Sequence, residues 1–177
     1  MCVRLWSALS PLILGLAALV FVVDQGHKFW MIDVYGIAGR APVAVTSFFD
    51  LVMVWNKGVS YGLFTTHTQA WLIWVSLVIS AMLWVWACGA ERAFTAAALA
   101  LVIGGALANA FDRAFRGAVA DFFHFHYQSL SWYVFNLADV AIVVGVGLLL
   151  YESLFMGDGA SRRGKGQLPW SFQPSTA

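Results

Sequence analysis

The stretch Trp132–Phe155, WYVFNLADVAIVVGVGLLLYESLF, decides the fold class, because it is apolar except at Asn136, Asp139 and Glu152. A helix needs about 20 apolar residues to cross the hydrocarbon core of a bilayer, which is about 30 Å thick. Three further segments of similar length carry no charge: Leu5–Val23, Ala70–Cys88 and Ala93–Phe111. The sequence therefore predicts an all-α membrane protein with four transmembrane helices.

The composition of the whole chain supports this interpretation. Of its 177 residues, 61% are hydrophobic and 11% are charged, and the mean hydropathy is +0.78. A soluble domain carries about 25% charged residues, so this chain lacks the polar sequence that a water-facing surface needs. The formal net charge of +1 argues against a nucleic-acid partner. Cys2 and Cys88 have no metal-ligand or CxxC spacing, so no disulfide framework, metal site or cofactor is expected.

The first apolar segment has an alternative interpretation as a cleaved signal peptide, because Arg4 precedes it. Its apolar stretch is longer than the core of a typical signal peptide. It also lacks a convincing small-residue cleavage site followed by a polar start. We therefore expect it to remain as a transmembrane helix, with residues 1–156 forming one integral membrane domain.

Four spans place both termini on the same side of the membrane. The basic residues divide evenly between the two sides, but one set lies in tails and short loops beside helix ends, where the positive-inside rule applies best. That set is Arg4, Arg92, Arg162, Arg163 and Lys165. The presence of these basic residues beside helix ends favours cytoplasmic termini. Residues 157–177 are rich in Gly, Ser, Arg and Pro and are expected to form a disordered cytoplasmic tail.

The two outward connections differ in length. Residues 24–69 form a long insert, and Ser47–Phe64 within it is β-branched and aromatic with glycine breakers. That pattern favours a small sheet or hairpin. Residues 112–131 join the third and fourth helices, and Phe122–Tyr127 alternates Phe and His, which is typical of a segment at the membrane interface.

Asp139 is the strongest functional candidate, because an ionisable side chain at membrane depth is costly. It lies one turn inside the fourth predicted helix and three residues after Asn136, so the two share a face and Asn136 can orient the carboxylate. The alternative is that Asn136 only caps the helix and Asp139 only favours its N-terminal dipole. Capping does not require an acid at this depth, so we expect Asp139 to be functional.

The end of the third predicted helix repeats this spacing. Asn109 and Asp112 stand three residues apart, followed by Arg113 and, one turn on, Arg116. The small residues Gly104, Gly105, Ala106 and Ala108 permit close approach of a neighbouring helix. Asp112 and the arginines form either interfacial ion pairs or part of a site, and we expect them to support a site.

Asp121 lies between apolar neighbours just outside a span, where a single acid is often a solvated loop residue. If Asp121 pairs with Asp139, however, the two carboxylates can carry out acid–base chemistry together. Two carboxylates in a medium of low dielectric constant cannot both ionise readily, so they share one proton. One then activates water as a base, and the other protonates the scissile amide. The pair predicts an aspartyl protease and leaves open which carboxylate is the acid.

Other chemistries have less support. His124 and His126 lack a third metal ligand of clear spacing and are expected to be interfacial, while His27 and His67 are expected in loops, as are the acids Asp33 and Asp50. Two other functions remain open. One is a small transporter in which Asp139 relays protons, and the other is an assembly factor that binds partner helices through small residues.

Five blocks of sequence occur in order between the first and fourth predicted helices. They are Asp24-Gln25-x-x-Lys28, Asn56-Lys57-Gly58-Val59-Ser60-Tyr61-Gly62, Gly104-Gly105-x-x-x-Asn109-x-x-Asp112-Arg113, Gly117-x-Val119-x-Asp121-Phe122 and Phe135-Asn136-x-Ala138-Asp139. Together they resemble signal peptidase II, the prolipoprotein (lipoprotein) signal peptidases of bacteria, which form aspartyl protease family A8. Tyr61 and Ala108 depart from the usual Phe and Gly of this pattern, and neither change removes a reactive group.

The resemblance implies a membrane aspartyl endopeptidase with Asp121 and Asp139 as its catalytic dyad. It implies that Asn56, Asn109, Arg113 and Asn136 order the substrate and the dyad, that Asp24, Lys28 and Asp112 hold the site together, and that Gly58 and Ala138 belong to the same blocks. It also implies cytoplasmic termini in the bacterial inner membrane, with the active site at the periplasmic face. A small periplasmic β-cradle would be built from the insert 24–69, between the first two helices.

The implied substrates are prolipoproteins whose cysteine carries diacylglycerol, cut on the N-terminal side of that cysteine. Membrane lipids are the other expected partners, and a monomer is expected. The cradle and Phe122–Tyr127 are expected to close over the lipid-modified bond, where they clamp the substrate and limit water access.

Overall fold

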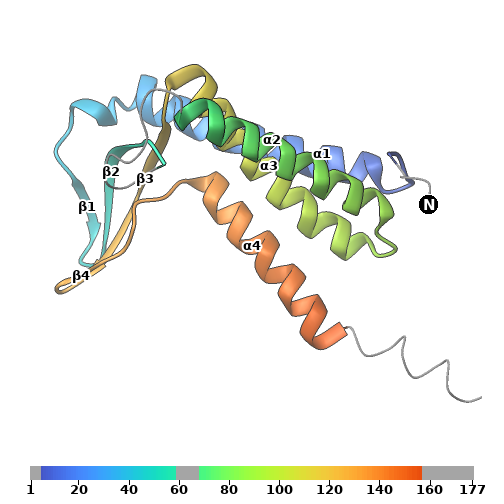
Figure 1. Cartoon of the computed structure of the whole chain (residues 1–177). Helices are drawn as coiled ribbons and strands as arrows, with labels where there is room; N and C mark the ends of the chain where they lie inside the picture. The colour runs from blue at the N-terminus through green and yellow to red at the C-terminus, as the bar shows by residue number, and fades with distance from the viewer. Residues whose placement is uncertain (1–4, 59–67, 157–177) are drawn as a thin grey trace, which may run out of the picture.

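The computed structural model describes residues 5–58 and 68–156 of the chain (Figure 1). The prediction of four apolar helices is confirmed: Ser10–Val34, Gln69–Gly89, Ala93–Arg116 and Leu137–Met156 are long and apolar enough to cross a membrane. They comprise α1 (Ser10–Phe29), α2 (Thr68–Gly89), α3 (Ala93–Arg116) and α4 (Leu137–Tyr151), with π-helical turns η1 (Trp30–Val34) and η3 (Glu152–Met156) extending α1 and α4. Cys2, His67 and the predicted tail 157–177 lie outside the described residues.

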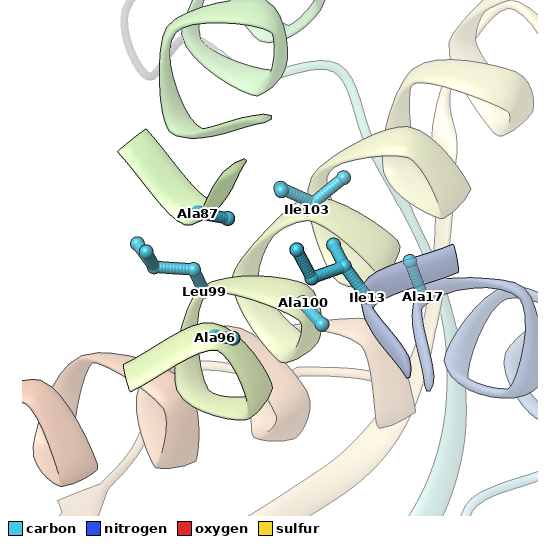
Figure 2. Packing of buried hydrophobic residues seen from close by; sticks show 7 residues of the cluster. All are labelled: Ile13, Ala17, Ala87, Ala96, Leu99, Ala100 and Ile103. Carbon is cyan, nitrogen blue, oxygen red and sulfur yellow. The ribbon is translucent and has the colours of Figure 1, made fainter. Parts of the chain in front are cut away.

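The central helix is α3, which packs against each of the other three. Glycine permits this packing. A Cβ on Gly104 would lie 2.7 Å from the carbonyl oxygen of Ala17 in α1, and one on Gly105 would lie 2.5 Å from that of Ala138 in α4. Both separations are too short for a carbon atom, so the small residues of the sequence do set the helix spacing. An apolar core lies along the same helix (Figure 2), formed by Ile13, Ala17, Ala87, Ala96, Leu99, Ala100 and Ile103.

Four helix boundaries differ from the apolar pattern by five residues or more. The pattern predicts that the first helix begins at Leu5, but α1 begins at Ser10. The pattern predicts an end at Val23, but α1 continues through Asp24 and Lys28, whose side chains are fully buried and paired with each other. The third predicted helix ends at Phe111, but α3 continues to Arg116 and stops before Gly117, which has the left-handed conformation (φ 74°) that commonly ends helices.

The fourth predicted helix begins at Trp132, but α4 begins at Leu137. The residues before it are extended, and the backbone of Phe135 donates a hydrogen bond to Phe123 at 3.0 Å. The apolar pattern missed this boundary because an aromatic strand and an apolar helix are equally hydrophobic.

A four-stranded antiparallel sheet lies at one end of the helices (Figure 1). Its strands are ordered β1 (Val43–Thr46), β2 (Phe49–Asn56), β3 (Val119–Tyr127) and β4 (Leu130–Ser131). The prediction of a sheet within Ser47–Phe64 is therefore partly wrong: β1 and β2 come from the insert, but β3 and β4 come from the connection 112–131. Residues 59–64 lie outside the described part of the chain.

The strands β2 and β3 are hydrogen-bonded neighbours in this sheet, with Asp50 opposite His124 and Val54 opposite Asp121. The two segments expected to clamp the substrate are therefore parts of one sheet, and their closure over a substrate stays a prediction. Asp50 is a strand residue rather than a loop acid, and its Oδ2 lies 3.0 Å from Nε2 of His126 and 3.8 Å from Nδ1 of His124. Asp33 lies in η1 and is exposed.

A second apolar core fixes the start of β3 against the chain that follows α1. It joins Met31 and Ile37 to Ala120 and Phe122, all of them buried. His27, expected in a loop, lies in α1 instead, and its ring packs 5.5 Å from that of Phe122. The two neighbours of Asp121 in the chain are thus fully buried, and they determine where its carboxylate lies.

Candidate active site

The helix α4 begins with a capping box that involves the predicted pair Asn136 and Asp139. The Asn136 Oδ1 accepts a hydrogen bond from the backbone of Asp139 at 3.0 Å, and Oδ2 of Asp139 accepts one from the backbone of Asn136 at 3.2 Å. The capping interpretation is therefore correct, but the cap uses only the Oδ1 atom of the Asn136 side chain. The Nδ2 group remains available as a donor.

That Nδ2 group reaches the second predicted acid. It donates to Oδ1 of Asp121 at 2.6 Å and to Oδ1 of Asn109 at 3.2 Å. Asn109 in turn donates through its own Nδ2 to Oδ1 of Asp139 at 2.8 Å. A chain of two side-chain amides thus links a carboxylate on β3 to a carboxylate on α4.

Asp121 is nearly fully buried, with 1% of its surface exposed. Burial raises the pKa of its carboxyl to about 6, against the opposing effect of hydrogen bonds from Asn136 and Asn56, and the nearby charge of Asp139 raises it further. The Asn56 Nδ2 donates to the second carboxylate oxygen at 3.0 Å. Asp121 therefore exchanges its proton near the pH range in which general acids and bases work well.

The turn after β2 holds Asn56 in this position. The Oδ1 of Asn56 accepts a hydrogen bond from the backbone of Gly58 at 2.8 Å, which forms an Asx turn. Gly58 has a positive φ of 80°, and a Cβ there would lie 2.5 Å from Cδ1 of Leu72 in α2. The predicted residue Gly58 thus lets this turn approach α2.

Asp121 lies in the wall of a cavity of about 800 Å³, which we call the active-site cavity. Its lining residues are Val54, Trp55, Asn56, Lys57, Gly58, Arg113, Asp121, His124, Ser131, Trp132, Tyr133 and Val134. The guanidinium of Arg113 donates to the carbonyl oxygen of Asn109 at 3.2 Å. The cavity therefore combines a buried carboxylate with amide and guanidinium donors.

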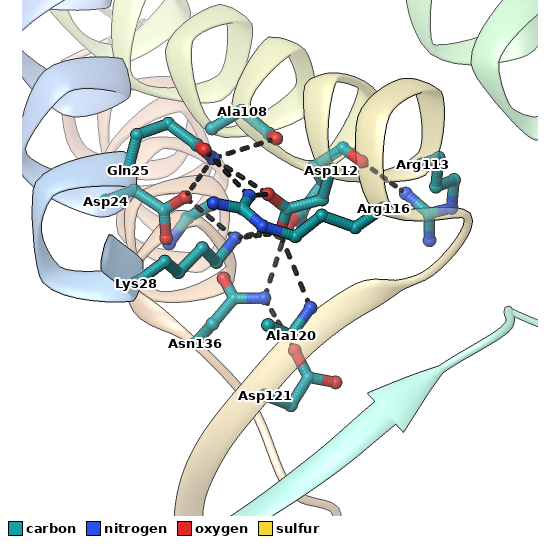
Figure 3. A network of polar contacts seen from close by, with 12 residues as sticks. Asp24, Gln25, Lys28, Ala108, Asp112, Arg113, Arg116, Ala120, Asp121 and Asn136 are labelled. Atoms are coloured by element: carbon teal, nitrogen blue, oxygen red, sulfur yellow. Dashed lines mark hydrogen bonds and ion pairs between the residues drawn. The ribbon is translucent and has the colours of Figure 1, made fainter. Parts of the chain in front are cut away.

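A buried ion network lies next to Asp121 and Asn136 (Figure 3). The Lys28 Nζ lies 2.7 Å from Oδ2 of Asp24 and 2.6 Å from Oδ2 of Asp112, and all three side chains are fully buried. Asp24 also accepts a hydrogen bond from the backbone of Ala138 at 3.0 Å, which ties α1 to the first turn of α4. Buried charges persist only when they are paired and hydrogen-bonded, so this network fixes three helices around the acids.

Arg116, which the sequence predicts to support a site, belongs to this network, as does Gln25, for which the sequence predicts no role. The Gln25 Nε2 lies 3.1 Å from Oδ2 of Asp24 and 3.0 Å from Oδ1 of Asp112. Arg116 pairs with Asp112 and donates to Oε1 of Gln25 at 3.0 Å. The spacing of Asp112 and Arg116 indicates a pair on one helix, but only the fold shows that Gln25 completes it.

Comparisons with known proteins agree with this geometry. The family profile of signal peptidase (SPase) II matches residues 16–155. The lipoprotein signal peptidase of Methylocella silvestris is 49% identical over 162 residues, covering 89% of this chain and 95% of that protein. The lipoprotein signal peptidase of Beijerinckia indica subsp. indica is 48% identical over 153 residues, covering 82% and 90% of the two chains.

Two solved structures, both described as bacterial membrane enzymes, have the same fold. One has a TM-score of 0.72 at 22% identity and covers 92% of this chain and 98% of the other. The second has a TM-score of 0.73 at 23% identity and covers 85% and 97%. The profile and the relatives span most of the sequence, and this chain therefore belongs to the signal peptidase II family, peptidase family A8, and is a membrane protease.

Proposed function

We propose that this protease is of the aspartic type, with Asp121 and Asp139 as its catalytic dyad. The observation that carries the proposal is the link between the two carboxylates through Asn136 and Asn109. Asp121, at one end of this link, lines the active-site cavity. Neutral amide donors position the carboxylate oxygens without neutralising their charge. The burial of Asp121, which raises its pKa, favours the shared proton that aspartic chemistry requires.

The mechanism follows from the different environments of the two acids. The carboxyl of Asp121, with its raised pKa, holds the shared proton at rest. The half-buried carboxylate of Asp139 takes a proton from a water molecule, whose oxygen attacks the scissile carbonyl carbon. Asp121 then donates its proton to the leaving amide nitrogen, and the products are a carboxyl terminus and an amine.

We propose that the substrates are prolipoproteins bearing a diacylglyceryl cysteine, cut on the N-terminal side of that cysteine. The relatives are lipoprotein signal peptidases, which supports the substrate class. The scissile bond of such a substrate lies at the membrane surface, and the acids here lie where the helices meet the sheet. Placing the sheet on the periplasmic face puts both termini in the cytoplasm. An impermeant thiol reagent added to spheroplasts should then label a Lys57→Cys variant and not an Arg92→Cys variant.

The test of the dyad is cleavage of a lipid-modified precursor by Asp121→Asn and Asp139→Asn proteins. Each change should lower turnover at least about a thousandfold, because each removes a proton-transfer group. The control is Asp33→Asn, which replaces an exposed acid in η1 and should leave turnover unchanged. Substantial cleavage by either dyad variant would refute the assignment. Loss with Asp139→Asn alone would favour a proton relay instead.

A further inference from the structure

An apolar cavity of about 820 Å³ lies beside the active-site cavity, and we call it the aromatic cavity. Its apolar walls include Phe48, Phe125, Tyr127, Leu130 and Phe135. The rings of Phe125 and Phe135 stack 5.8 Å apart and that of Phe125 lies 4.9 Å from Phe49, so the aromatic wall continues onto β2. A volume of this size falls within the range of about 300–1,000 Å³ that is usual for ligand sites.

The two cavities share a wall. Ser131, Trp132 and Tyr133 line both of them. The hairpin of β3 and β4 fixes this wall, because the backbone of Trp132 donates to the carbonyl oxygen of Phe125 at 2.8 Å and His126 stands opposite Ser131. A ligand with a polar part at Asp121 and an apolar part can therefore extend from one cavity into the other.

The lining of the aromatic cavity fits an alkyl chain. His126 is its one ionisable side chain other than tyrosine, and the Nε2 of that histidine lies 3.0 Å from Oδ2 of Asp50. Leu130 is 73% exposed and Trp132 is 70% exposed. Large apolar side chains that are exposed together mark a surface made for an apolar partner.

We propose that the aromatic cavity receives one acyl chain of the diacylglyceryl group on the substrate cysteine. This inference rests on the proposed function, since the lipid is attached to the residue beside the scissile bond. When that bond lies at Asp121, the thioether of the cysteine lies in the active-site cavity, which shares the wall Ser131–Tyr133 with the aromatic cavity. The acyl chain then passes over Ser131 and Trp132 into the aromatic cavity.

A second apolar groove offers a comparison. It has a volume of about 570 Å³ and lies between α1, α2 and α3, with Leu14, Phe21, Leu77, Phe111 and Phe115 among its walls. It shares no lining residue with the active-site cavity. An acyl chain attached beside the scissile bond therefore enters the aromatic cavity more directly than this groove.

The test measures cleavage of two precursors that differ only in acyl chain length, in bicelles of one composition. Wild-type protein should have the lower KM for the long-chain precursor. Leu130→Ser and Phe48→Ser remove walls of the aromatic cavity alone, and each should raise that KM roughly tenfold at near wild-type kcat. Both changes should also reduce the difference between the two precursors.

The matched control is Leu154→Ser, because Leu154 is 71% exposed and lies in η3, at the other end of α4 from the acids. It should leave both KM values unchanged. Wild-type KM values and chain-length dependence in Leu130→Ser and Phe48→Ser would overturn the inference, as would a tenfold effect of Phe115→Ser instead. Failure of the wild-type protein to cleave either precursor would instead overturn the proposed function.

A second measurement does not depend on variants. A precursor with a photoreactive group at the end of one acyl chain should crosslink to peptides within residues 125–135. Crosslinks confined to residues 107–115 would place the chain in the groove beside α3 and overturn the inference.

Discussion

The four aspartates at and beside the proposed active site form two pairs that differ in their partners. Asp24 and Asp112 contact the Lys28 ammonium, and Asp112 also pairs with Arg116. Asp121 and Asp139 accept hydrogen bonds from side-chain amides, and no lysine or arginine nitrogen of the described residues lies within 4.0 Å of them. The cation contacts of Asp24 and Asp112 hold three helices together. Asp121 accepts hydrogen bonds from amides, and its burial raises its pKa to about 6, which suits the proposed proton transfer.

The largest expected effect tests the first group. Lys28→Met leaves Asp24 without its cation in a fully buried site and should lower the free energy of unfolding by about 3–5 kcal/mol. Thermal unfolding in detergent micelles measures this loss. Lys57→Met, which replaces an exposed lysine, should shift it by no more than about 0.5 kcal/mol. Equal stability of the two variants would show that the network is not structural.

The second prediction concerns Asp121 and the dependence of the protein's stability on pH. The pKa of Asp121 is about 6 in the folded protein against 3.8 for the free group, so the folded state binds this proton more tightly. Its contribution, about 3 kcal/mol, is complete below the lower value and is lost as the pH rises through about 6. The melting temperature of the wild-type protein should therefore fall between pH 4 and pH 6, and that of the Asp121→Asn protein should fall less. An unchanged slope would contradict the assignment of the proton to Asp121.

A third prediction separates the two roles of Asn136. Asn136→Ala removes both the cap and the amide donor, so it should lower stability by about 1 kcal/mol. Asn136→Ser keeps a capping oxygen but has no amide to donate to Asp121. Both variants should lose activity about a hundredfold, while the serine variant retains wild-type stability. Full activity of the serine variant would mean that the cap is the only role of Asn136.

The smallest expected effect concerns an ion pair at the other end of the bundle, between the exposed Arg92 and the buried Glu152. Arg92 is half exposed and lies 3.3 Å from Oε1 of Glu152, which also accepts a hydrogen bond from Oγ1 of Thr95 at 2.8 Å. Arg92→Gln should therefore change the free energy of unfolding by at most about 1 kcal/mol. A loss of stability as large as that of Lys28→Met would show that the burial of Lys28 does not explain why its ion pair with Asp24 contributes more than the pair of Arg92 and Glu152.

Some of this structure was predictable because it depends on local chemistry. Four long apolar runs predict four membrane helices, and the Asn136–Asp139 spacing predicts a shared helix face. Gly104 and Gly105 predict close packing, and both meet a neighbouring backbone. Each of these features arises within one segment, or from the absence of a side chain, so it can be read without knowing the fold.

Other features were wrong or missing because they depend on partners far along the chain. A charged pair such as Asp24 and Lys28 normally ends an apolar helix, and only Asp112 from α3 makes its burial possible. The sequence indicates β3 and β4 only as an interfacial connection between the third and fourth helices, because the partner strand of β3 lies in the insert before α2. Gln25 joins the network through contacts to α3, which no local spacing indicates.

The sequence by itself determined that this is a four-helix membrane protein of a protease family, and it identified the two acids proposed for its chemistry. Hydrophobic runs and motif order carry that information, because membrane insertion and reactive groups depend on residue type. The tertiary structure alone decided which acids meet cations and which meet amides. It also placed the aromatic cavity beside the proposed dyad, because both result from packing β3 and α4 against distant segments.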